Sequence, residues 1–162
     1  MTTFHIAQLN IARGRASMTD PLMAGFVAQL DTINTLAERS PGFVWRLKTD
    51  DGNATSIRAF DDDLMIVNIS VWESIDSLFA FTYKSEHVQV FRQRSDWFEH
   101  SIAPSLTLWW LPAGTVPTVE EAKTRLEHLH QHGPTHFAFN FKARFSMTNQ
   151  SDVSNLTAEG TS

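Results

Sequence analysis

Short runs with a period of two alternate along this chain with longer runs whose period is near 3.6. The first pattern is typical of β-strands and the second of amphipathic helices. Strands are expected at residues 4–12, 43–48, 64–72, 105–111 and 137–145. Helices are expected at 21–39 and 119–132, and a helical pair at 78–98. Helices interleaved with short strands predict an α+β split βαβ sandwich, with the helices on one face of a mainly antiparallel sheet.

Local signals mark where several of these elements begin and end. Asp20 and Pro21 provide a capping oxygen and a preset first turn, and Thr118 with Glu121 forms a capping box. Pro41-Gly42 and Gly133-Pro134 are stop signals. Neighbours in a strand point to opposite faces, so Trp109 and Trp110 are expected in two different environments.

The composition excludes several classes of function. Thirteen Lys and Arg against eighteen Asp and Glu give a net charge of −5, which argues against nucleic acid and anionic membranes as partners. There is no cysteine, so thiol catalysis and cysteine metal sites are excluded. The N-terminus has no basic flank and the apolar stretches are short, so we expect no signal peptide, no spanning helix and a cytoplasmic location.

One domain is expected over residues 1–145. After Ser146 the sequence is polar, small and aperiodic, so residues 146–162 are expected to be a disordered tail. The apolar faces of the last strand and of the strand at 64–72 offer more surface than three amphipathic helices would cover on one side. We therefore predict a homodimer that buries this surface.

A helical stripe in the segment 83–98 is the strongest candidate for a site. At 100° per residue, polar and aromatic side chains fall with His87 within one arc of about 120°: Tyr83, Val90, Phe91, Arg94, Trp97 and Phe98. An unpaired guanidinium is not tolerated in a core, so Arg94 is expected to be buried near His87 or a carboxylate in a pocket. The alternatives are a satisfied core edge and a dimer contact.

In such a pocket His87 would be the general base, and Arg94 would lower the pKa of His87 and hold the anion that forms. These two are the predicted catalytic residues. The predicted substrate-binding residues are aromatic: Tyr83, Phe91, Trp97, Trp109 and Trp110.

No metal site is predicted. Asp61, Asp62 and Asp63 are neighbours in a loop and are expected to form a solvated turn. His128 and His132 have a spacing that can clamp a metal, but their helix face is expected to be solvated and no nearby carboxylate completes the coordination. Motifs for nucleotide binding and for a serine nucleophile are absent.

Several short motifs resemble known proteins. Val71-Trp72-Glu73-Ser74 leading to Tyr83 and His87 resembles the strand-to-helix segment of the dimeric α+β barrel superfamily, which includes antibiotic biosynthesis monooxygenases. Leu108-Trp109-Trp110, Pro117-Thr118 and Gly133-Pro134-Thr135 resemble the family called domain of unknown function 3291. The resemblance implies a ferredoxin-like sandwich, a dimer formed through the sheets and a pocket between sheet and helices.

The resemblance and the stripe together suggest three hypotheses. The first is a small-molecule enzyme of monooxygenase-like type, without a cofactor, acting on a hydrophobic or aromatic metabolite. The second is a haem protein with His87 as the axial ligand. The third is a binding module for a small ligand that carries out no chemistry.

Overall fold

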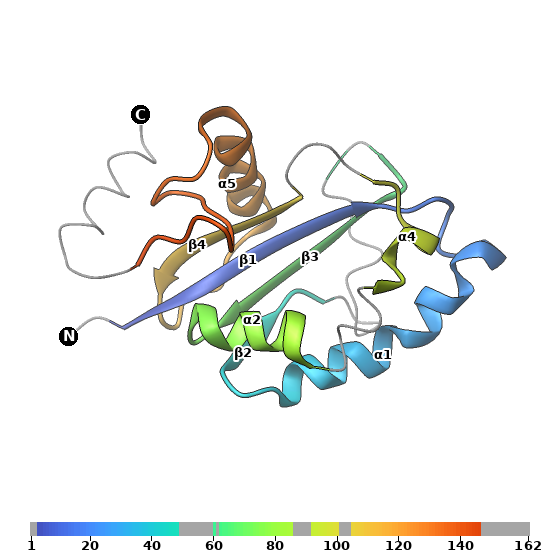
Figure 1. The fold of residues 1–162 in the computed structure, drawn as a ribbon, viewed down its shortest axis with the longest axis horizontal. Helices are drawn as coiled ribbons and strands as arrows, with labels where there is room; N and C mark the ends of the chain where they lie inside the picture. The colour runs from blue at the N-terminus through green and yellow to red at the C-terminus, as the bar shows by residue number, and fades with distance from the viewer. Residues whose placement is uncertain (1–2, 49–59, 61, 86–91, 101–104, 147–162) are drawn as a thin grey trace.

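The computed structural model describes residues 3–48, 60, 62–85, 92–100 and 105–146, and its sheet has four antiparallel strands in the order β2-β3-β1-β4 (Figure 1). The strands are β1 (Phe4–Arg13), β2 (Phe43–Arg46), β3 (Met65–Trp72) and β4 (Leu106–Pro112). A 3₁₀ turn (Pro21–Met23) precedes the helices α1 (Ala24–Arg39), α2 (Ile75–Lys84), α4 (Arg94–Trp97) and α5 (Val119–His132). This strand order with β-α-β-β-α-β connectivity confirms the expected α+β, ferredoxin-like sheet.

The expected helix starts are confirmed by their capping bonds. The side chain of Asp20 accepts a hydrogen bond from the Leu22 amide, and that of Thr118 accepts one from the Glu121 amide. Ser74 caps α2 in the same way through the Ser77 amide. These bonds satisfy amides that have no partner within the first helical turn.

The sheet has two faces, which we name after the helices that cover them. On the α2 face, Ile6, Trp72 and Leu108 pack with α1 and α2 through Ala37 and Leu78. On the α5 face the buried side chains of the three central strands pack against Ala122 and Leu126 of α5; they are Ala7, Leu9, Val67, Ile69, Val71, Trp109 and Leu111. Helices therefore lie on both faces, where one covered face was expected. Trp109 and Trp110 belong to different clusters, as predicted.

The prediction of a strand at 137–145 is wrong. Phe139 forms one isolated bridge with Leu108, through backbone hydrogen bonds of 2.8 and 2.9 Å. The side chain of Asn140 then accepts from the amides of Lys142 and Ala143, which turns the chain away from the sheet. Phe139, Phe141 and Phe145 instead pack into the α2-face cluster.

A helical pair was expected in this region, and the prediction that its second helix runs from Tyr83 to Phe98 is wrong. Helix α2 ends at Lys84, because Ser85 has extended backbone angles. Helix α4 is a single turn, and Phe98 after it is extended and bridges to Gly14. The helical arc that placed Tyr83 and Trp97 on one stripe therefore does not exist.

The apolar strand face used to predict a homodimer is covered within one chain. Val67, Ile69 and Val71 are each 1% exposed, since α5 and other parts of the same chain pack over them. The surplus of apolar sheet surface is therefore not found at these residues, and the homodimer stays a prediction. Within the described parts of the chain, no helix has the length and apolar character needed to cross a membrane.

Candidate functional site

The structure separates the residues predicted from the helical stripe. His87 and Phe91 lie outside the described residues, as does the tail from 147 onward. Arg94 is exposed on α4, so the prediction that it is buried is wrong. The one-turn helix has one buried position, and Trp97 occupies it.

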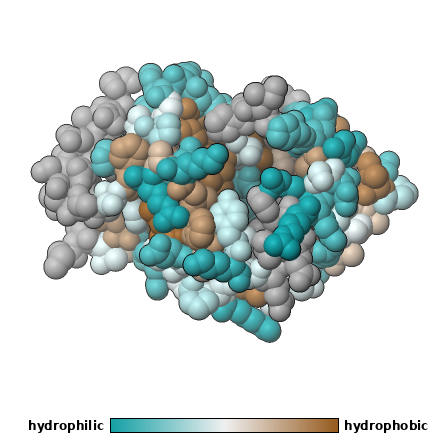
Figure 2. Space-filling model, viewed as in Figure 1, coloured by the Kyte–Doolittle hydropathy of each residue, from teal (hydrophilic) through white to brown (hydrophobic). Residues whose placement is uncertain are grey.

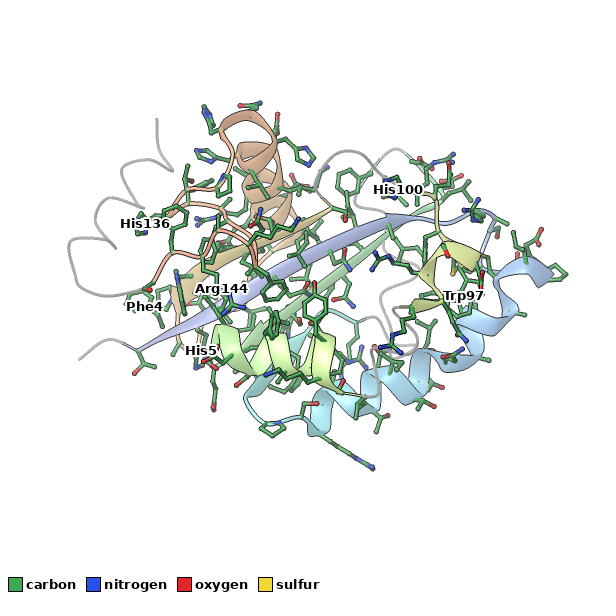
Figure 3. The ribbon with its side chains drawn as sticks, in the orientation of Figure 1. Phe4, His5, Trp97, His100, His136 and Arg144 are labelled. Atoms are coloured by element: carbon green, nitrogen blue, oxygen red, sulfur yellow. The ribbon has the colours of Figure 1, made fainter. Side chains whose placement is uncertain are left out.

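Trp97 packs against the start of α1, as Figure 3 also shows. Its ring centroid lies 5.7 Å from that of Phe26, and its ring atoms contact Gly25 closely enough that a Cβ there would meet them at 3.4 Å. Trp109 is fully buried on the α5 face, below the guanidinium of Arg125. Neither tryptophan is brought next to Tyr83.

Tyr83 and Trp110 do lie in one aromatic region, on the α2 face. The Tyr83 ring centroid is 4.8 Å from that of Phe79 and 5.7 Å from that of Phe141. Trp110 packs against Phe139 and donates its indole N–H to the carbonyl of Phe145 at 2.7 Å. Figure 2 shows apolar side chains on this side of the molecule among hydrophilic ones.

The segment that follows α5 covers part of this aromatic region. Arg144 lies 3.6 Å from the carboxylate of Asp76 and places its guanidinium 5.0 Å from the ring centre of Phe79. The His136 ring packs against Phe145 within the same segment, with 4.6 Å between ring centroids and 55° between planes; Figure 3 labels both His136 and Arg144. The contacts of Arg144 with Asp76 and Phe79 hold the segment against α2. The sequence predicted a fifth strand for this segment.

A row of polar side chains crosses the middle of the α2 face, and we call it the amide row: Gln8, Asn10, Asn68 and Ser70. The register of β1 and β3 places Gln8 opposite Ser70 and Asn10 opposite Asn68. Gln8 Nε2 donates to Asn68 Oδ1 at 2.6 Å and to Ser70 Oγ at 2.8 Å. The row runs from the interior to solvent, because Gln8 and Ser70 are buried while Asn10 and Asn68 are exposed.

Ser70 is the centre of the buried end of this row. Its Oγ accepts the bond from Gln8 and a second from Trp72 Nε1 at 2.9 Å. A hydroxyl oxygen has two acceptor lone pairs and one proton. Since both lone pairs are used, the hydroxyl proton of Ser70 is left to point toward a third group.

Aromatic rings form a wall beside the buried end of the amide row. Trp72 stacks on Phe81 of α2, with 5.2 Å between ring centroids and 27° between planes. Phe43 contacts the same indole edge-on at 5.4 Å. The hydrogen-bonding groups thus border aromatic rings, of which Trp72 is buried while Phe43 and Phe81 are half-buried.

Arg46 extends the polar groups onto β2. It is the register partner of Ser70, and its Nη2 lies 3.6 Å from Glu38 Oε1 on α1. The side chain of Arg46 is 11% exposed and that of Glu38 is 40% exposed. A cation is therefore held next to the amide row with little access to water.

Sequence reasoning missed the amide row and Arg46. Their signal was present, because amide and hydroxyl residues occupy alternate positions of two otherwise apolar strands at Gln8, Asn10, Asn68 and Ser70. The predicted site residues were instead titratable and aromatic side chains on a helical stripe.

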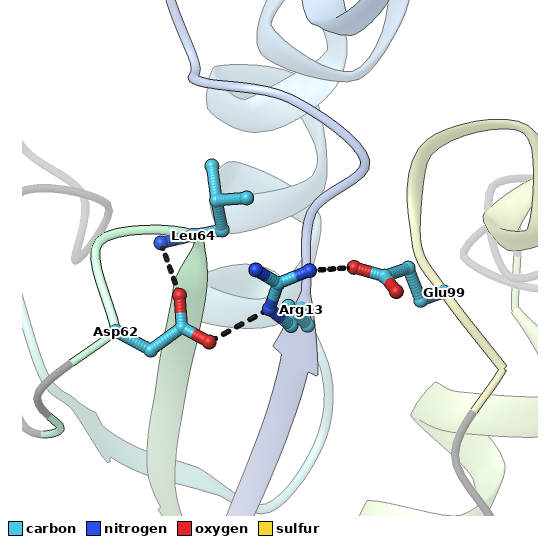
Figure 4. Close-up of polar contacts among 4 residues, drawn as sticks. All are labelled: Arg13, Asp62, Leu64 and Glu99. Carbon is cyan, nitrogen blue, oxygen red and sulfur yellow. Dashed lines mark hydrogen bonds and ion pairs between the residues drawn. The ribbon is translucent and has the colours of Figure 1, made fainter.

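The charged cluster at the other end of β1 is structural. Arg13 lies between the carboxylates of Asp62 and Glu99, with 2.7 Å between Arg13 Nε and Asp62 Oδ2 (Figure 4). The hydrogen bond from Arg13 lowers the pKa of Asp62, and a bond from the Leu64 amide lowers it further. A solvated turn was expected here: Asp63 is exposed in the turn, Asp62 is half-buried and paired with Arg13, and Asp61 lies outside the described residues.

His128 and His132, whose spacing could clamp a metal, lie side by side on α5. His128 and His132 have ring centroids 4.4 Å apart, and His128 also packs on Phe137 at 4.6 Å. The expectation that this helix face is solvated is wrong for His128, which is half-buried. The described residues contain no group of three or more side chains able to hold a metal ion.

Arg125 serves the packing of α5. Its guanidinium lies 3.9 Å from the ring centre of Phe137 and donates to the carbonyl of the same residue at 2.9 Å. Burial lowers the pKa of Arg125, and the nearby carboxylate of Glu121 opposes this shift. The residue ties the C-terminal segment to the helix on the α5 face, away from the amide row.

Comparison with known proteins gives a family match and several structural similarities. The sequence model of the family described as a domain of unknown function (DUF3291) matches residues 5–155. A search of curated proteins found no match.

Three of the similar solved structures illustrate the likeness. A candidate antibiotic biosynthesis monooxygenase from Nitrosomonas europaea has a TM-score of 0.42 and 14% identity, over 72% of this chain and 93% of that one. Rv0793 from Mycobacterium tuberculosis has a TM-score of 0.44 and 14% sequence identity, and the match covers 70% of this chain and 99% of that one. The ActVA-Orf6 monooxygenase of Streptomyces coelicolor, in complex with Nanaomycin D, has a TM-score of 0.37 and 15% sequence identity. This match covers 72% of this chain and 94% of that one. Similarities this low assign no activity to this chain.

Proposed function

Since the chain belongs to the family described as a domain of unknown function (DUF3291), whose description names no activity, we propose a function from the amide row itself. The protein is a small-molecule enzyme of monooxygenase-like type. Its substrate is a hydrophobic or aromatic metabolite with an acidic C–H or a phenol, bound on the α2 face between the sheet and the helices.

The observation that supports this proposal is the bonding of Ser70. Its Oγ accepts from two buried donors, so its proton is directed to a further acceptor. The amide nitrogen of the exposed Asn68 is a second donor on the same strand face, because Asn68 Oδ1 already accepts from Gln8. Two fixed donors beside each other suit an oxygen that gains negative charge during a reaction.

The chemistry requires a base and an anion site. His87 is the proposed base, and it takes the proton from the acidic C–H or the phenol. The amide row, in place of the exposed Arg94, stabilises the resulting oxyanion. When the reacting carbon is a CH2 group, O2 converts it to C=O and releases one water, so the substrate supplies all the electrons and no cofactor is needed.

Haem is the alternative cofactor, with His87 as its expected axial ligand. The amides and the hydroxyl of the amide row are not among the side chains that ligate haem iron. We therefore route no step through haem. A Soret band in the purified protein, or after addition of haem, would contradict the cofactor-free proposal.

The proposal is tested with planar probes that carry an acidic group: 1-naphthol, 1,4-dihydroxynaphthalene and 1,3-cyclohexanedione. Oxygen uptake above the uncatalysed rate is expected with at least one of them. Asn68→Ala should lower kcat/KM about 10²-fold, as loss of one oxyanion donor does. His87→Ala should abolish turnover while probe binding is kept. Thr124→Ala, on the exposed side of α5, is the control and should be unchanged.

Binding is followed separately through the side-chain amide signals of Gln8 and Asn68 in ¹⁵N NMR spectra. A binding module that performs no chemistry would show shifts of these signals without oxygen uptake. If no probe shifts these signals and no probe is oxidised, the site is not on the amide row.

A further inference from the structure

We propose that residues 140–146, which we name the C-terminal strap, occupy part of the ligand site, and that a flat ligand with a carbonyl oxygen takes the place of Phe145. The inference rests on the proposed function, because the strap lies beside the amide row on the α2 face. It adds the indole of Trp110 as a further donor to the same ligand, and it names a segment that must move before the ligand binds.

The strap covers residues that border the amide row. Phe141 and Phe145 pack against the cluster that contains Ile6 and Leu108. Leu108 is the register partner of Gln8 on β4, and Ile6 lies two residues before Gln8 on the same face of β1. Moving the strap would therefore uncover the sheet next to the buried end of the amide row.

The strap is held less firmly than the residues before it. Residues 137–139 are buried, and Phe139 forms two backbone hydrogen bonds with Leu108. Every residue from 140 to 146 is half-buried or exposed, and none of them forms a backbone–backbone hydrogen bond with another described residue. Segments with few buried contacts and no ladder bonds open at a low free energy.

The side-chain contacts between the strap and α2 are also near the surface. Arg144 Nη1 lies 3.6 Å from Asp76 Oδ1, and the Asp76 side chain is 95% exposed (Figure 3 labels Arg144). Exposed ion pairs contribute little to stability. Phe141 packs edge-on against Phe79 and Tyr83, which are half-buried and exposed. A ligand that makes comparable contacts can therefore replace those of the strap.

The contacts of Phe145 are those that a flat carbonyl compound would make. Its backbone carbonyl accepts the hydrogen bond from Trp110 Nε1 at 2.7 Å. Its ring centroid lies 5.8 Å from that of Phe139 and 4.6 Å from that of His136. An aromatic ring that carries a carbonyl group offers the same acceptor and the same flat apolar face.

His136 gives a second, independent indication of a ligand. Its Nδ1 is buried and forms no hydrogen bond with a described residue. Buried polar nitrogens in proteins normally have a partner, and the phenyl ring of Phe145 beside this imidazole offers none. An oxygen substituent on a ligand in place of that ring can bond to Nδ1. The ligand class is therefore an oxygenated aromatic compound and not a plain hydrocarbon.

The first test compares two phenols that differ in one carbonyl oxygen: 6-acetyl-2-naphthol and 6-ethyl-2-naphthol. Dissociation constants are measured by calorimetry. The native protein is expected to bind the acetyl compound about tenfold more tightly, as one added hydrogen bond allows. The acetyl compound should also shift the ¹⁵N NMR signal of the Trp110 indole. Trp110→Phe keeps a ring without the N–H and should remove the preference. Equal affinity of the native protein for both phenols would overturn the proposal.

The second test fixes the strap against α2. The chain has no cysteine, so Asp76→Cys together with Arg144→Cys can be linked selectively with 1,2-ethanediyl bismethanethiosulfonate, and a reductant opens the link. The linked protein should bind 6-acetyl-2-naphthol at least tenfold more weakly, and the reductant should restore the affinity. The control is Glu127→Cys with Gln131→Cys, an exposed pair on α5 linked in the same way, which should bind as the native protein does. Unchanged affinity with the strap linked would contradict the proposal.

A single variant separates competition with the ligand from packing. Phe145→Ala removes the ring that the ligand replaces, so it should bind 6-acetyl-2-naphthol at least threefold more tightly than the native protein. Lys142→Ala, at an exposed position of the strap, is the control and should be unchanged. If Phe145 only packs the fold, Phe145→Ala should lose stability without any gain in affinity, which overturns the proposal.

The failure of this inference differs from the failure of the proposed function. If 6-acetyl-2-naphthol shifts the amide signals of Gln8 and Asn68 equally with the strap linked and free, the row binds ligands but the inference about the strap is wrong. If linking the strap lowers the affinity but no probe is oxidised, the strap covers a binding site and the monooxygenase-like function is wrong. If neither the native protein nor Phe145→Ala binds either phenol, the inference about the strap is overturned, and oxygen uptake with the earlier probes decides the function separately.

Discussion

At the residue scale, the side chain of Ser70 is the acceptor on which two buried donors depend. Gln8 Nε2 and Trp72 Nε1 both donate to its Oγ, from β1 and from β3 itself. A buried donor without an acceptor loses the hydrogen bond and cannot recover it from water. The hydroxyl therefore stabilises the fold and also shapes the proposed anion site.

Ser70→Ala is expected to lower the free energy of unfolding by about 1–3 kcal/mol, because two buried N–H groups lose their acceptor. The measurement is urea denaturation followed by tryptophan fluorescence. Ser95→Ala, at an exposed position of α4, is the control and should change the free energy by less than about 0.5 kcal/mol. Equal stability of both variants would show that the Ser70 bonds are not formed in solution.

Asp62 gives a prediction for acidic pH. The hydrogen bond from Arg13 lowers the folded-state pKa of Asp62 below its ordinary value near 4. The unfolded chain then binds the proton more readily, so this contribution to stability is present above the unfolded pKa and is lost as the pH falls through the folded pKa. Asp62→Asn should therefore show a shallower loss of stability below about pH 4 than the native protein. Parallel urea midpoints from pH 5 to pH 2 would contradict this assignment.

At the element scale, the turn between α1 and β2 positions the edge strand that carries Arg46. Gly42 has φ of +84°, a region that strains any residue with a Cβ. A Cβ at this position would also lie 2.5 Å from the Cβ of Ser77 in α2. The carbonyl of Gly42 accepts from the Glu73 amide, so this turn, the end of β3 and the start of α2 pack together.

Gly42→Ala is expected to destabilise the protein by clearly more than Gly114→Ala. Both glycines have positive φ, which costs about 1–2 kcal/mol for alanine, but a Cβ on Gly114 meets nothing within 4 Å. The difference between the two free energies of unfolding isolates the clash with Ser77. Similar values would mean that α2 shifts away from the turn at little cost.

At the scale of the whole molecule, α5 covers the sheet face that was expected to have no helices on it. Leu126 is 3% exposed and packs on the same cluster as Trp109, Val67 and Ile69. The core on this face is therefore formed within one chain. A homodimer, which we still predict, must place its contact on other surfaces or on the outer side of α5.

Leu126→Ala is expected to lower the free energy of unfolding by about 2–5 kcal/mol, since it leaves a cavity between α5 and the sheet. The loss should be independent of protein concentration if this core is intramolecular.

Sedimentation of the native protein at micromolar concentration tests the predicted homodimer. A dimer is expected, and a monomer would contradict the prediction. The dimer should persist in Leu126→Ala at temperatures where this variant stays folded.

The sequence determined most of the secondary structure because the signals involved are local. Alternation along a strand and the caps at Asp20 and Thr118 depend on neighbours a few residues away. Four of the five expected strands and the helices α1 and α5 are therefore found close to their predicted positions. Family resemblance and periodicity together also predicted the ferredoxin-like sheet.

The tertiary structure decided the features that depend on distant residues. Phe139, Phe141 and Phe145 pack into the α2-face cluster, and only Phe139 bridges to β4. Alternation within a segment does not encode whether the segment pairs with a sheet edge, because pairing also depends on the residues of that edge. The amide row joins Gln8 to Ser70 across 62 residues of sequence, through a strand register that local patterns do not encode. Each of these side chains is ordinary in its own strand, and pairing in the folded sheet is what brings them together into the candidate site.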